Sequence, residues 1–494
     1  EILLLKTTAN LSTGGTAIDV TDSVHPANVH IAERAIRIVG LDIGGVDIVA
    51  PDITTPLSEN NGGIVELNAA PGFRMHLQPT KGLPRNVAEP VIDMLFPPGS
   101  SSTIPIIAVT GTNGKTTTTR LLNHIMKFVG HTVGMCTTEG VYIKNRLIYE
   151  GDMTGPLSHK MVLTDPTVDM AVLECARGGM LRSGLGFRYC DVGVVTNVSA
   201  DHLGQNYIND LEKMSRVKGI IPEVVKPDGY AILNADDSLV AKMANQTKGK
   251  VIYFSLDGKL NPVIKEHLKS GGMAVIFEEG VFCIMKGKWK YPLVEAKDVP
   301  LTFDGKARFN IANVLAAIGA AIAMGVKNEN INAALTTFFP SYSQTPGRLT
   351  MFDMGPYKAL VDFAHNVAGY DALAEFVRSL NPENSIATIC LPGDRRDEDF
   401  QNVAKTVAET FNQVILFEGY LRGKKTGYIS NTLQKYLISY GMDSNKIEII
   451  ADEHDAVQYA LDLAQEGDLL VISNYDIEGV HNRLIEHKKI IETK

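Results

Sequence analysis

A glycine-rich turn followed by a Lys–Thr pair has the clearest chemical meaning in this sequence. The apolar run 104–110 leads into GTNGKTTTT at residues 111–119. Glycines let backbone N–H groups point inward, and the following helix N-terminus carries partial positive charge, so such a turn can cradle phosphate, with a turn that only joins strand to helix as the alternative. Val109 stands where the common pattern has its first glycine. The predicted phosphate site comprises Gly111, Thr112, Asn113, Gly114, Lys115, Thr116 and Thr117.

Two further polar residues follow strand-like runs that flank this turn in the sequence. Glu174 ends MAVLE and His202 follows VVTNVSAD. Carboxyl ends of parallel strands meet at one sheet edge, so both side chains are expected beside Lys115. Oxygen and imidazole groups there can serve Mg²⁺ held by Thr116. Local hydrogen bonding or capping is the alternative for each residue taken alone.

Composition excludes several classes of protein. The chain has 494 residues, 45% of them hydrophobic, and a net charge of -9, so we expect two to four domains with real cores and no nucleic-acid or anionic-membrane partner. Five scattered cysteines without a C-x-x-C pair, and an N-terminus without signal-peptide order, favour a reducing cytoplasm. The longest mostly apolar run, 311–326, is too short for a membrane span.

The apolar periods divide the chain into blocks of different character. Residues 1–78 are predicted to be α+β, with strands near 1–8, 16–22, 46–53 and 62–69 and a helix over 27–39. A Pro-, Gly- and Ser-rich stretch over 79–103 is predicted to be a linker. Alternating strands and helices predict an α/β nucleotide-binding domain over 104–343 and a Rossmann-like, doubly wound domain over 344–494.

Several motifs together resemble the Mur ligase superfamily of ATP-dependent amide-forming ligases. They are TGTNGKTTT, the strand-end Glu174, TNVSADHLG, FNIANVLAA, PGR and VDFAHN, in the family's order. GDMTGPLSHK, LECARGGMLRSGLGF and LPGDRRDEDF are similar to the cyanophycin synthetase family within it. The resemblance implies a Mur ligase-like P-loop central domain followed by a Rossmann-like C-terminal domain.

The resemblance also implies roles for individual residues. Lys115 would hold the γ phosphate, Thr116 and Glu174 one Mg²⁺, and His202 a second Mg²⁺. Lys218 occupies the position where many Mur ligases carry a lysine carbamate, a modification that turns an ammonium into an anionic metal ligand. An unmodified lysine on a helix surface is the alternative.

Other positions are matched to nucleotide and substrate contacts. Asn310 and Asn313 resemble the adenine-contacting pair, with helix capping as an alternative for Asn310. Arg348, Asp362 and His365 fall where family members bring charged groups onto the phosphates, although Arg348 can equally pin a hinge through a salt bridge.

The loop beside Glu174 carries several cations. Arg177 and Arg182, with Ser158 upstream, are predicted to hold an acidic substrate, and solvated loop charge is the alternative for the arginines. We interpret the acidic cluster 394–399 as a helix N-terminus rather than as a guanidinium site.

The first block resembles the metal-binding end of an ATP-grasp domain. An Asp on one strand and a Glu-x-Asn on the next would supply Mg²⁺ ligands, which here are Asp47, Glu66 and Asn68, with a solvated edge strand as the alternative. Residues 1–78 match only the last part of that fold. We therefore expect either that a preceding portion is missing from this chain or that this half is vestigial.

The implied reaction is ATP- and Mg²⁺-dependent ligation through an acyl phosphate. The resemblance implies arginine joining side-chain carboxylates of a poly-aspartate backbone, aspartate addition at the ATP-grasp site if that site is whole, a cyanophycin primer, and a dimer or tetramer. A peptidoglycan-type Mur ligase and a polymer-binding homologue without catalysis are the alternatives.

Overall fold

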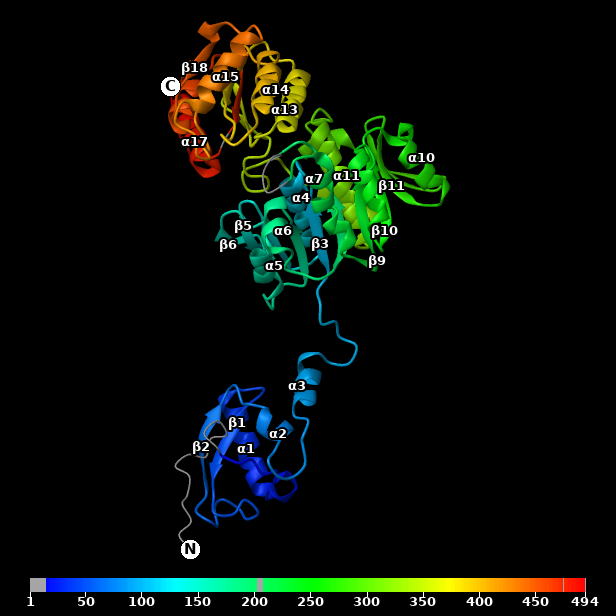
Figure 1. The fold of residues 1–494 in the computed structure, drawn as a ribbon, viewed down its shortest axis with the longest axis vertical. Coiled ribbons are helices and arrows are strands. Elements are labelled where there is room, and N and C mark those ends of the chain that lie inside the picture. Colours follow the sequence, from blue (N-terminus) through cyan, green and yellow to red (C-terminus); the bar gives the residue numbers. More distant parts are fainter. Residues whose placement is uncertain (1–14, 202–207, 474, 494) are drawn as a thin grey trace. The chain divides into compact units, whose positions relative to one another are not determined.

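The computed structural model describes residues 15–201, 208–473 and 475–493 (Figure 1). Two compact units divide between Thr103 and Ile104. The strand expected at 1–8 lies outside the described residues. Every helix in the described ranges is too short or too polar to cross a bilayer.

The first unit pairs two antiparallel strands against one helix. Strand β1 (Gly45–Val49) pairs with β2 (Gly63–Asn68), and α1 (Pro26–Val39) contacts β2. Proline suits the first position of α1, because N–H groups in the first turn of a helix have no intrahelical acceptor and proline has no N–H to leave unpaired. Where a strand was expected over 16–22, Ile18 forms only a single bridge and Thr21–Ser23 is a 3-10 helix, so that prediction was wrong. The other helices of this unit are α2 (Arg74–Leu77) and α3 (Ala88–Leu95).

The stretch predicted as a linker over 79–103 is partly structured. Helix α3 lies within it, and Arg85 pairs with Asp19 at 3.0 Å. Backbone N–H of Thr80 donates to the carbonyl of Ala17. The start of this stretch therefore belongs to the first unit, whereas residues 92–103 are exposed.

A mixed sheet forms the middle of the second unit. In the described part of the chain it has eleven strands in the order β13-β12-β11-β10-β9-β8-β3-β7-β4-β5-β6, and those from β11 to β4 run parallel. The strands are β3 (Ile106–Thr110), β4 (Val133–Thr137), β5 (Gly140–Ile143), β6 (Arg146–Glu150), β7 (Met170–Glu174), β8 (Cys190–Val195), β9 (Val225–Asn234), β10 (Lys250–Ser255), β11 (Met273–Glu278), β12 (Val281–Lys286) and β13 (Trp289–Glu295).

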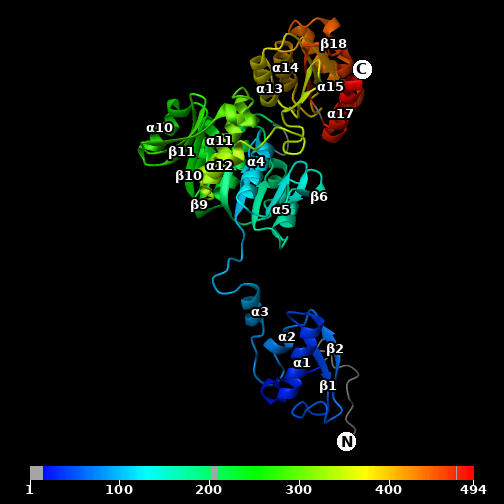
Figure 2. The ribbon, with the colours of Figure 1, turned by 180° about the vertical axis from the view of Figure 1, so that it is seen from behind.

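Helices cover both faces of this sheet because its strands are apolar on both sides. Alternate residues of β3 enter different cores: Ile107 and Val109 pack with α4 and α11, and Ile106 and Ala108 pack on the opposite face. Figure 2 shows α4 beside α11 and α12. The helices are α4 (Lys115–Phe128), α5 (Pro156–Leu163), α6 (Arg177–Ser183), α7 (Leu211–Lys218), α8 (Ile220–Glu223), α9 (Ser238–Ala241), α10 (Pro262–Lys269), α11 (Arg308–Ala323) and α12 (Asn328–Leu335).

The C-terminal part is an open, doubly wound sheet. Its six strands in the described residues follow the order β14-β15-β19-β16-β17-β18, and only β14 is antiparallel. The strands are β14 (Thr350–Asp353), β15 (Lys358–Asp362), β16 (Ser385–Ile389), β17 (Gln413–Leu416), β18 (Ile447–Ile449) and β19 (Leu469–Ser473). The helices are α13 (Val367–Leu380), α14 (Asp397–Ala408), α15 (Tyr428–Ser439), α16 (Glu453–Leu463) and α17 (Ile477–Thr493).

Candidate active site

The glycine-rich turn joins β3 to α4 and depends on its glycines. Gly111 has φ +154° and Gly114 has φ +83°. A Cβ on Gly111 would lie 1.8 Å from the Thr196 hydroxyl, and one on Gly114 would lie 2.1 Å from Asn313 Oδ1. Glycine is therefore required at both positions by close approach as well as by backbone conformation.

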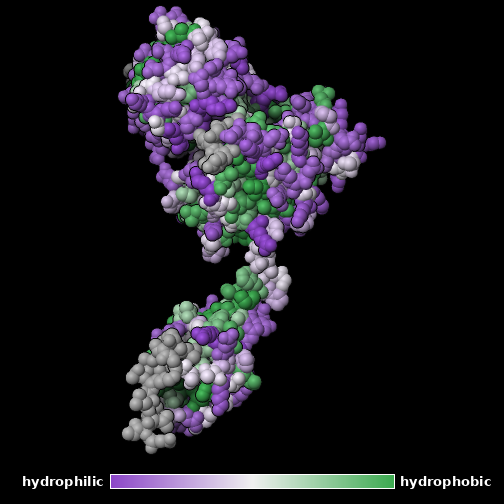
Figure 3. All heavy atoms as spheres, in the orientation of Figure 1, coloured by the Kyte–Doolittle hydropathy of each residue, from purple (hydrophilic) through white to green (hydrophobic). Residues whose placement is uncertain are grey.

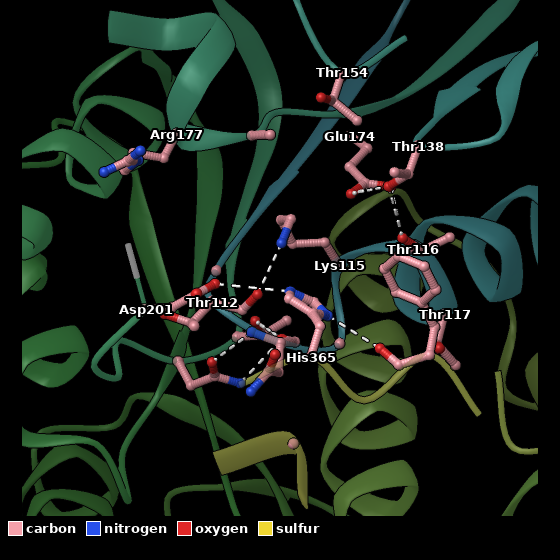
Figure 4. Close-up of a pocket in the computed structure, with 18 of the residues that line it drawn as sticks. Thr112, Lys115, Thr116, Thr117, Thr138, Thr154, Glu174, Arg177, Asp201 and His365 are labelled. Atoms are coloured by element: carbon pink, nitrogen blue, oxygen red, sulfur yellow. Dashed lines mark hydrogen bonds and ion pairs between the residues drawn. The ribbon is translucent and has the colours of Figure 1, made fainter. Parts of the chain in front are cut away.

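The turn is braced by the segment that follows β8. Thr112 N donates to the Asn197 carbonyl and Asn113 N to Asn197 Oδ1, both at 2.9 Å. Lys115 Nζ donates to the Thr112 carbonyl at 2.8 Å (Figure 4). The ammonium is thus held at the turn, where a phosphate oxygen can replace the carbonyl as acceptor.

A buried carboxylate faces the first turn of α4. Glu174 Oε2 accepts from the Thr116 hydroxyl at 2.9 Å, and Oε1 accepts from the Thr138 hydroxyl at 3.2 Å (Figure 4). Burial raises the pKa of Glu174 above its ordinary value, and nearby Lys115 opposes that effect.

This corner suits Mg²⁺ by its donors. Mg²⁺ is commonly held through one or two carboxylates together with substrate phosphates, so the carboxylate of Glu174 and the hydroxyl of Thr116 fit. Within the described ranges no three His, Cys, Asp or Glu side chains meet. His202, the predicted ligand of a second ion, lies outside the described residues.

Lys218 ends α7 inside the protein. It is only 3% exposed and lines the cavity that contains the glycine-rich turn, so the alternative of a surface lysine is wrong. Burial first, and the neighbouring Lys115 second, hold the pKa of Lys218 well below its ordinary value.

The C-terminal domain reaches the turn through a pair of amides. Asn366 Nδ2 donates to Asn113 Oδ1 at 3.0 Å, and Asn113 Nδ2 donates to Asn366 Oδ1 at 3.1 Å. Arg395, which is 7% exposed, forms an ion pair with Asp201 at 3.0 Å. His365 Nε2 lies 3.8 Å from Asp201, and burial lowers the pKa of His365 to about 4. The sequence interpretation missed Arg395 and Asp201 as site residues.

Arg348 and Asp362 lie together where the two domains join. Arg348 Nη2 is 3.6 Å from Glu139 Oε1, and its guanidinium lies 4.4 Å from the ring centre of Phe363. Asp362 Oδ2 accepts from Leu349 N at 2.9 Å. Burial raises the pKa of Asp362 to about 6, although Arg348 opposes the shift. Glu139 was also missed.

One cavity of about 710 Å³ takes its lining from both domains. All predicted residues of the phosphate turn line it, as do Glu174, Lys218, Asn310, Asn313, Arg348, Asp362 and His365. Asn310 does not cap α11, which begins at Arg308; its amide donates to the Leu301 carbonyl at 3.0 Å. The capping alternative is therefore wrong.

The predicted substrate residues differ in their surroundings. Arg177 and Arg182 of α6 line the cavity. Ser158 also lines it, but its hydroxyl lies 2.6 Å from the Met153 carbonyl and serves the local backbone. At the acidic cluster, α14 starts at Asp397 with three acidic residues in its first turn, as interpreted from the sequence.

The predicted ATP-grasp ligands meet within the first unit. Asp47 of β1 lies directly opposite Glu66 of β2, and Gly45 lies opposite Asn68. Cross-strand partners share one face, as do residues two apart, so all three polar side chains share a face. Asn68 Nδ2 lies 3.4 Å from Asp47 Oδ2.

Known proteins define the class to which this architecture belongs. Residues 109–321 match the Mur ligase middle domain, and residues 347–473 match the Mur ligase, glutamate ligase domain. A solved structure of E. coli FolC in complex with DHPP and ADP shares the fold, with a TM-score of 0.56 and 18% identity over 78% of this chain and 89% of that one. The chain therefore belongs to the Mur ligase family, and the α/β fold predicted for residues 104–494 is confirmed.

Within that family the similarity to one group is much stronger. The chain is 52% identical over 473 residues to cyanophycin synthetase of Crocosphaera subtropica, which covers 96% of this chain and 54% of the relative. UDP-N-acetylmuramoyl-L-alanyl-D-glutamate--2,6-diaminopimelate ligase of Bacteroides fragilis is 27% identical over 79% of this chain and 78% of its own. The chain is thus a cyanophycin synthetase homologue that spans about half the length of the curated relative.

Proposed function

We propose that this chain carries the ATP-dependent, arginine-adding ligase site of a cyanophycin synthetase. The observation that carries the proposal is the meeting of Lys115, the Thr116–Glu174 pair and Arg348 in one cavity lined by both domains. The 52% identity to a cyanophycin synthetase supports the choice of substrates, arginine and the side-chain carboxylates of a poly-aspartate backbone.

The chemistry follows from where the charges lie. A substrate carboxylate oxygen attacks the γ phosphorus, ADP leaves, and the amine of arginine then attacks the acyl carbon while phosphate departs and the nitrogen gives up a proton. Lys115 and Arg348 stabilise negative charge on the transferring phosphoryl group. Mg²⁺ at Thr116 and Glu174 supplies further charge neutralisation when bound. The amide pair between Asn113 and Asn366 brings the C-terminal domain over the cavity, which limits hydrolysis of the acyl phosphate by water.

Lys218 is proposed to act as a carbamate. Burial lowers the pKa of Lys218 and so raises the share of its neutral amine, and only the neutral amine can react with CO₂. The product is an anion, to which the nearby Lys115 is attracted, and it would supply a metal ligand. Mass measured on native protein with and without bicarbonate tests this modification.

The test of the ligase proposal is ADP release in the presence of ATP, Mg²⁺, an aspartate-rich primer and arginine. Lys115→Ala should reduce this release at least roughly a hundredfold, because a fixed phosphate donor is lost. Lys127→Ala, at the exposed end of the same helix, is the matched control. An unchanged rate in Lys115→Ala contradicts the assignment of the site.

Alternative acceptors separate the competing functions. Release of ADP with a UDP-muramyl peptide in place of the primer would favour the peptidoglycan-type ligase, for which the 27% identical relative is the supporting observation. Primer binding without any turnover would favour a polymer-binding homologue. Aspartate addition through Asp47, Glu66 and Asn68, and assembly into dimers or tetramers, are further proposals for the whole enzyme.

A further inference from the structure

Glu139 lies between two arginines at the turn that joins β4 to β5. Its Oε2 accepts from Arg120 Nε at 3.2 Å and Nη2 at 3.0 Å, and from the Thr137 hydroxyl at 2.7 Å. Arg120 belongs to α4, the helix that begins at the phosphate turn, and its guanidinium also donates to the Tyr142 hydroxyl. One oxygen of the carboxylate therefore accepts three hydrogen bonds, two from Arg120 and one from Thr137.

The other oxygen of Glu139 is arranged differently. Oε1 is buried and has no hydrogen-bond partner in the described part of the chain. It faces Arg348 Nη2 at 3.6 Å, which is within ion-pair range but beyond hydrogen-bond distance. Arg348 Nε is likewise buried without a partner among those residues.

This asymmetry matters for a phosphate-binding arginine. A carboxylate free to pair with Arg348 alone would take it bidentately and compete with phosphate for it. Because Arg120 already neutralises Glu139, attraction to Arg348 is reduced, yet the carboxylate still fixes where the second guanidinium sits. Phe363 closes the other side of Arg348 at 4.4 Å.

The same turn also contacts the proposed Mg²⁺ site at Thr116 and Glu174. Thr138, adjacent to Glu139, donates its hydroxyl to Glu174 Oε1 at 3.2 Å. Successive residues of one short turn thus contact the buried carboxylate on one side and the hinge arginine on the other.

We propose that Glu139 is a positioning residue that holds the Arg348 guanidinium at the cavity for the γ phosphate without sequestering it. The inference rests on the proposed function, because it assumes a nucleoside triphosphate in the cavity. It assigns a task to a residue that is not itself part of the cavity lining.

The test compares two nucleotides, so it does not need ligation. Dissociation constants for the ATP analogue AMPPNP and for ADP, each with Mg²⁺, are measured on Glu139→Gln, Arg348→Lys and the double variant. We expect Glu139→Gln to weaken AMPPNP binding roughly tenfold with little change for ADP, and to have little further effect in Arg348→Lys. Glu150→Gln, on the exposed strand β6, is the matched control.

Each other outcome has a defined meaning. Equal weakening for both nucleotides, additive effects in the double variant, or tighter AMPPNP binding in Glu139→Gln would overturn the positioning role. If Glu139→Gln fails to fold because Arg120 loses its partner, Glu139→Asp keeps the charge, withdraws it from Arg348, and is expected to give the same selective loss. Nucleotide binding without ligation by the unmodified chain would contradict the proposed function alone, and no nucleotide binding would contradict both.

Discussion

His159 supports the buried carboxylate through the main chain. Its Nδ1 accepts from Gly186 N at 3.2 Å, so Nε2 carries the proton and donates to the Glu174 carbonyl at 3.3 Å. The ring is fully buried, and burial lowers the pKa of His159 to about 4. The neutral imidazole therefore connects the end of β7 to the loop that contains Gly186. This loop follows α6, the helix to which Arg182 belongs.

The stability that His159 provides should depend on pH. The unfolded side chain binds a proton near pH 6.5 and the folded one near pH 4, so acid favours the unfolded state across that window. We expect His159→Gln to lower the free energy of unfolding by roughly 1–3 kcal/mol at pH 7.5. The difference should shrink as the pH falls from 6.5 towards 4. Urea titrations at pH 7.5 and pH 5 measure it, and a constant difference contradicts a neutral buried ring.

Replacing Glu174 is expected to weaken metal binding without lowering stability. Glu174→Gln removes a buried charge but keeps the shape, so the melting temperature should stay the same or rise. Affinity for Mg²⁺-AMPPNP should fall by at least about tenfold, because the site loses a negatively charged ligand, while metal-free ADP binding should change little. Thermal melts and nucleotide titrations with and without Mg²⁺ check this. Equal losses with and without the metal would argue against a metal ligand.

At the scale of elements, the phosphate turn tolerates no side chain at Gly111. Gly111→Ala would place a Cβ 1.8 Å from the Thr196 hydroxyl and near the backbone of Asn197, so β3 and the segment after β8 must separate. We expect AMPPNP binding to fall more than roughly tenfold and stability to fall by about 1–3 kcal/mol.

Gly130→Ala, beyond the other end of α4, is the control for that substitution. Its φ is +102°, and an added Cβ meets nothing within 4 Å, so it costs backbone strain alone. Nucleotide titration and urea unfolding of both variants make the comparison. Similar effects on AMPPNP binding at both glycines would show that the turn is not specially constrained.

Most elements could be predicted from the sequence because their signals are local. The strand over 106–110, the start of α4 and the starts of α11 and α12 follow from apolar runs and turn residues. The apolar pattern over 211–225 is typical of one helix, but the structure has α7, the separate turn of α8 and the start of β9 at Val225 there. Pro222 has no N–H to donate within a continuous helix, so the break is a local signal that the sequence interpretation overlooked.

Contacts across domains lay beyond sequence reasoning. Because carboxyl ends of parallel strands meet at one sheet edge, the sequence predicted Glu174 beside Lys115, and β3 and β7 are neighbours in the structure. The sequence could not predict that Arg395 reaches Asp201 or that Glu139 faces Arg348, because these pairs depend on how two separately folded sheets dock. The one sequence signal for Arg395 was the cluster of charged residues in LPGDRRDEDF. The sequence interpretation considered only the acidic residues of that cluster.

At the scale of the whole molecule, the first unit has little interior. Between residues 15 and 103 only Asn28 and Leu57 are buried, whereas Ile38 is 73% and Val65 is 69% exposed. Apolar atoms reach the surface around α3 (Figure 3). Hydrophobic burial is the main source of stability, so this unit should be much less stable than the second.

Limited proteolysis tests that difference. A brief digest with a protease of broad specificity should remove the first unit and leave a resistant fragment that starts within the exposed stretch 92–103. N-terminal sequencing and intact mass identify the cut. Initial cleavage inside residues 104–494, with the first unit left whole, would contradict the expected order.

The amide of Asn366 constrains how the C-terminal domain can move. Besides meeting Asn113, its Oδ1 accepts from Gly369 N at 2.8 Å and so caps α13. A straight withdrawal of the domain leaves that cap intact, whereas re-aiming the side chain would fray the first turn of the helix. An opening that carries Asn366 away from Asn113 without turning its side chain would therefore keep α13 capped.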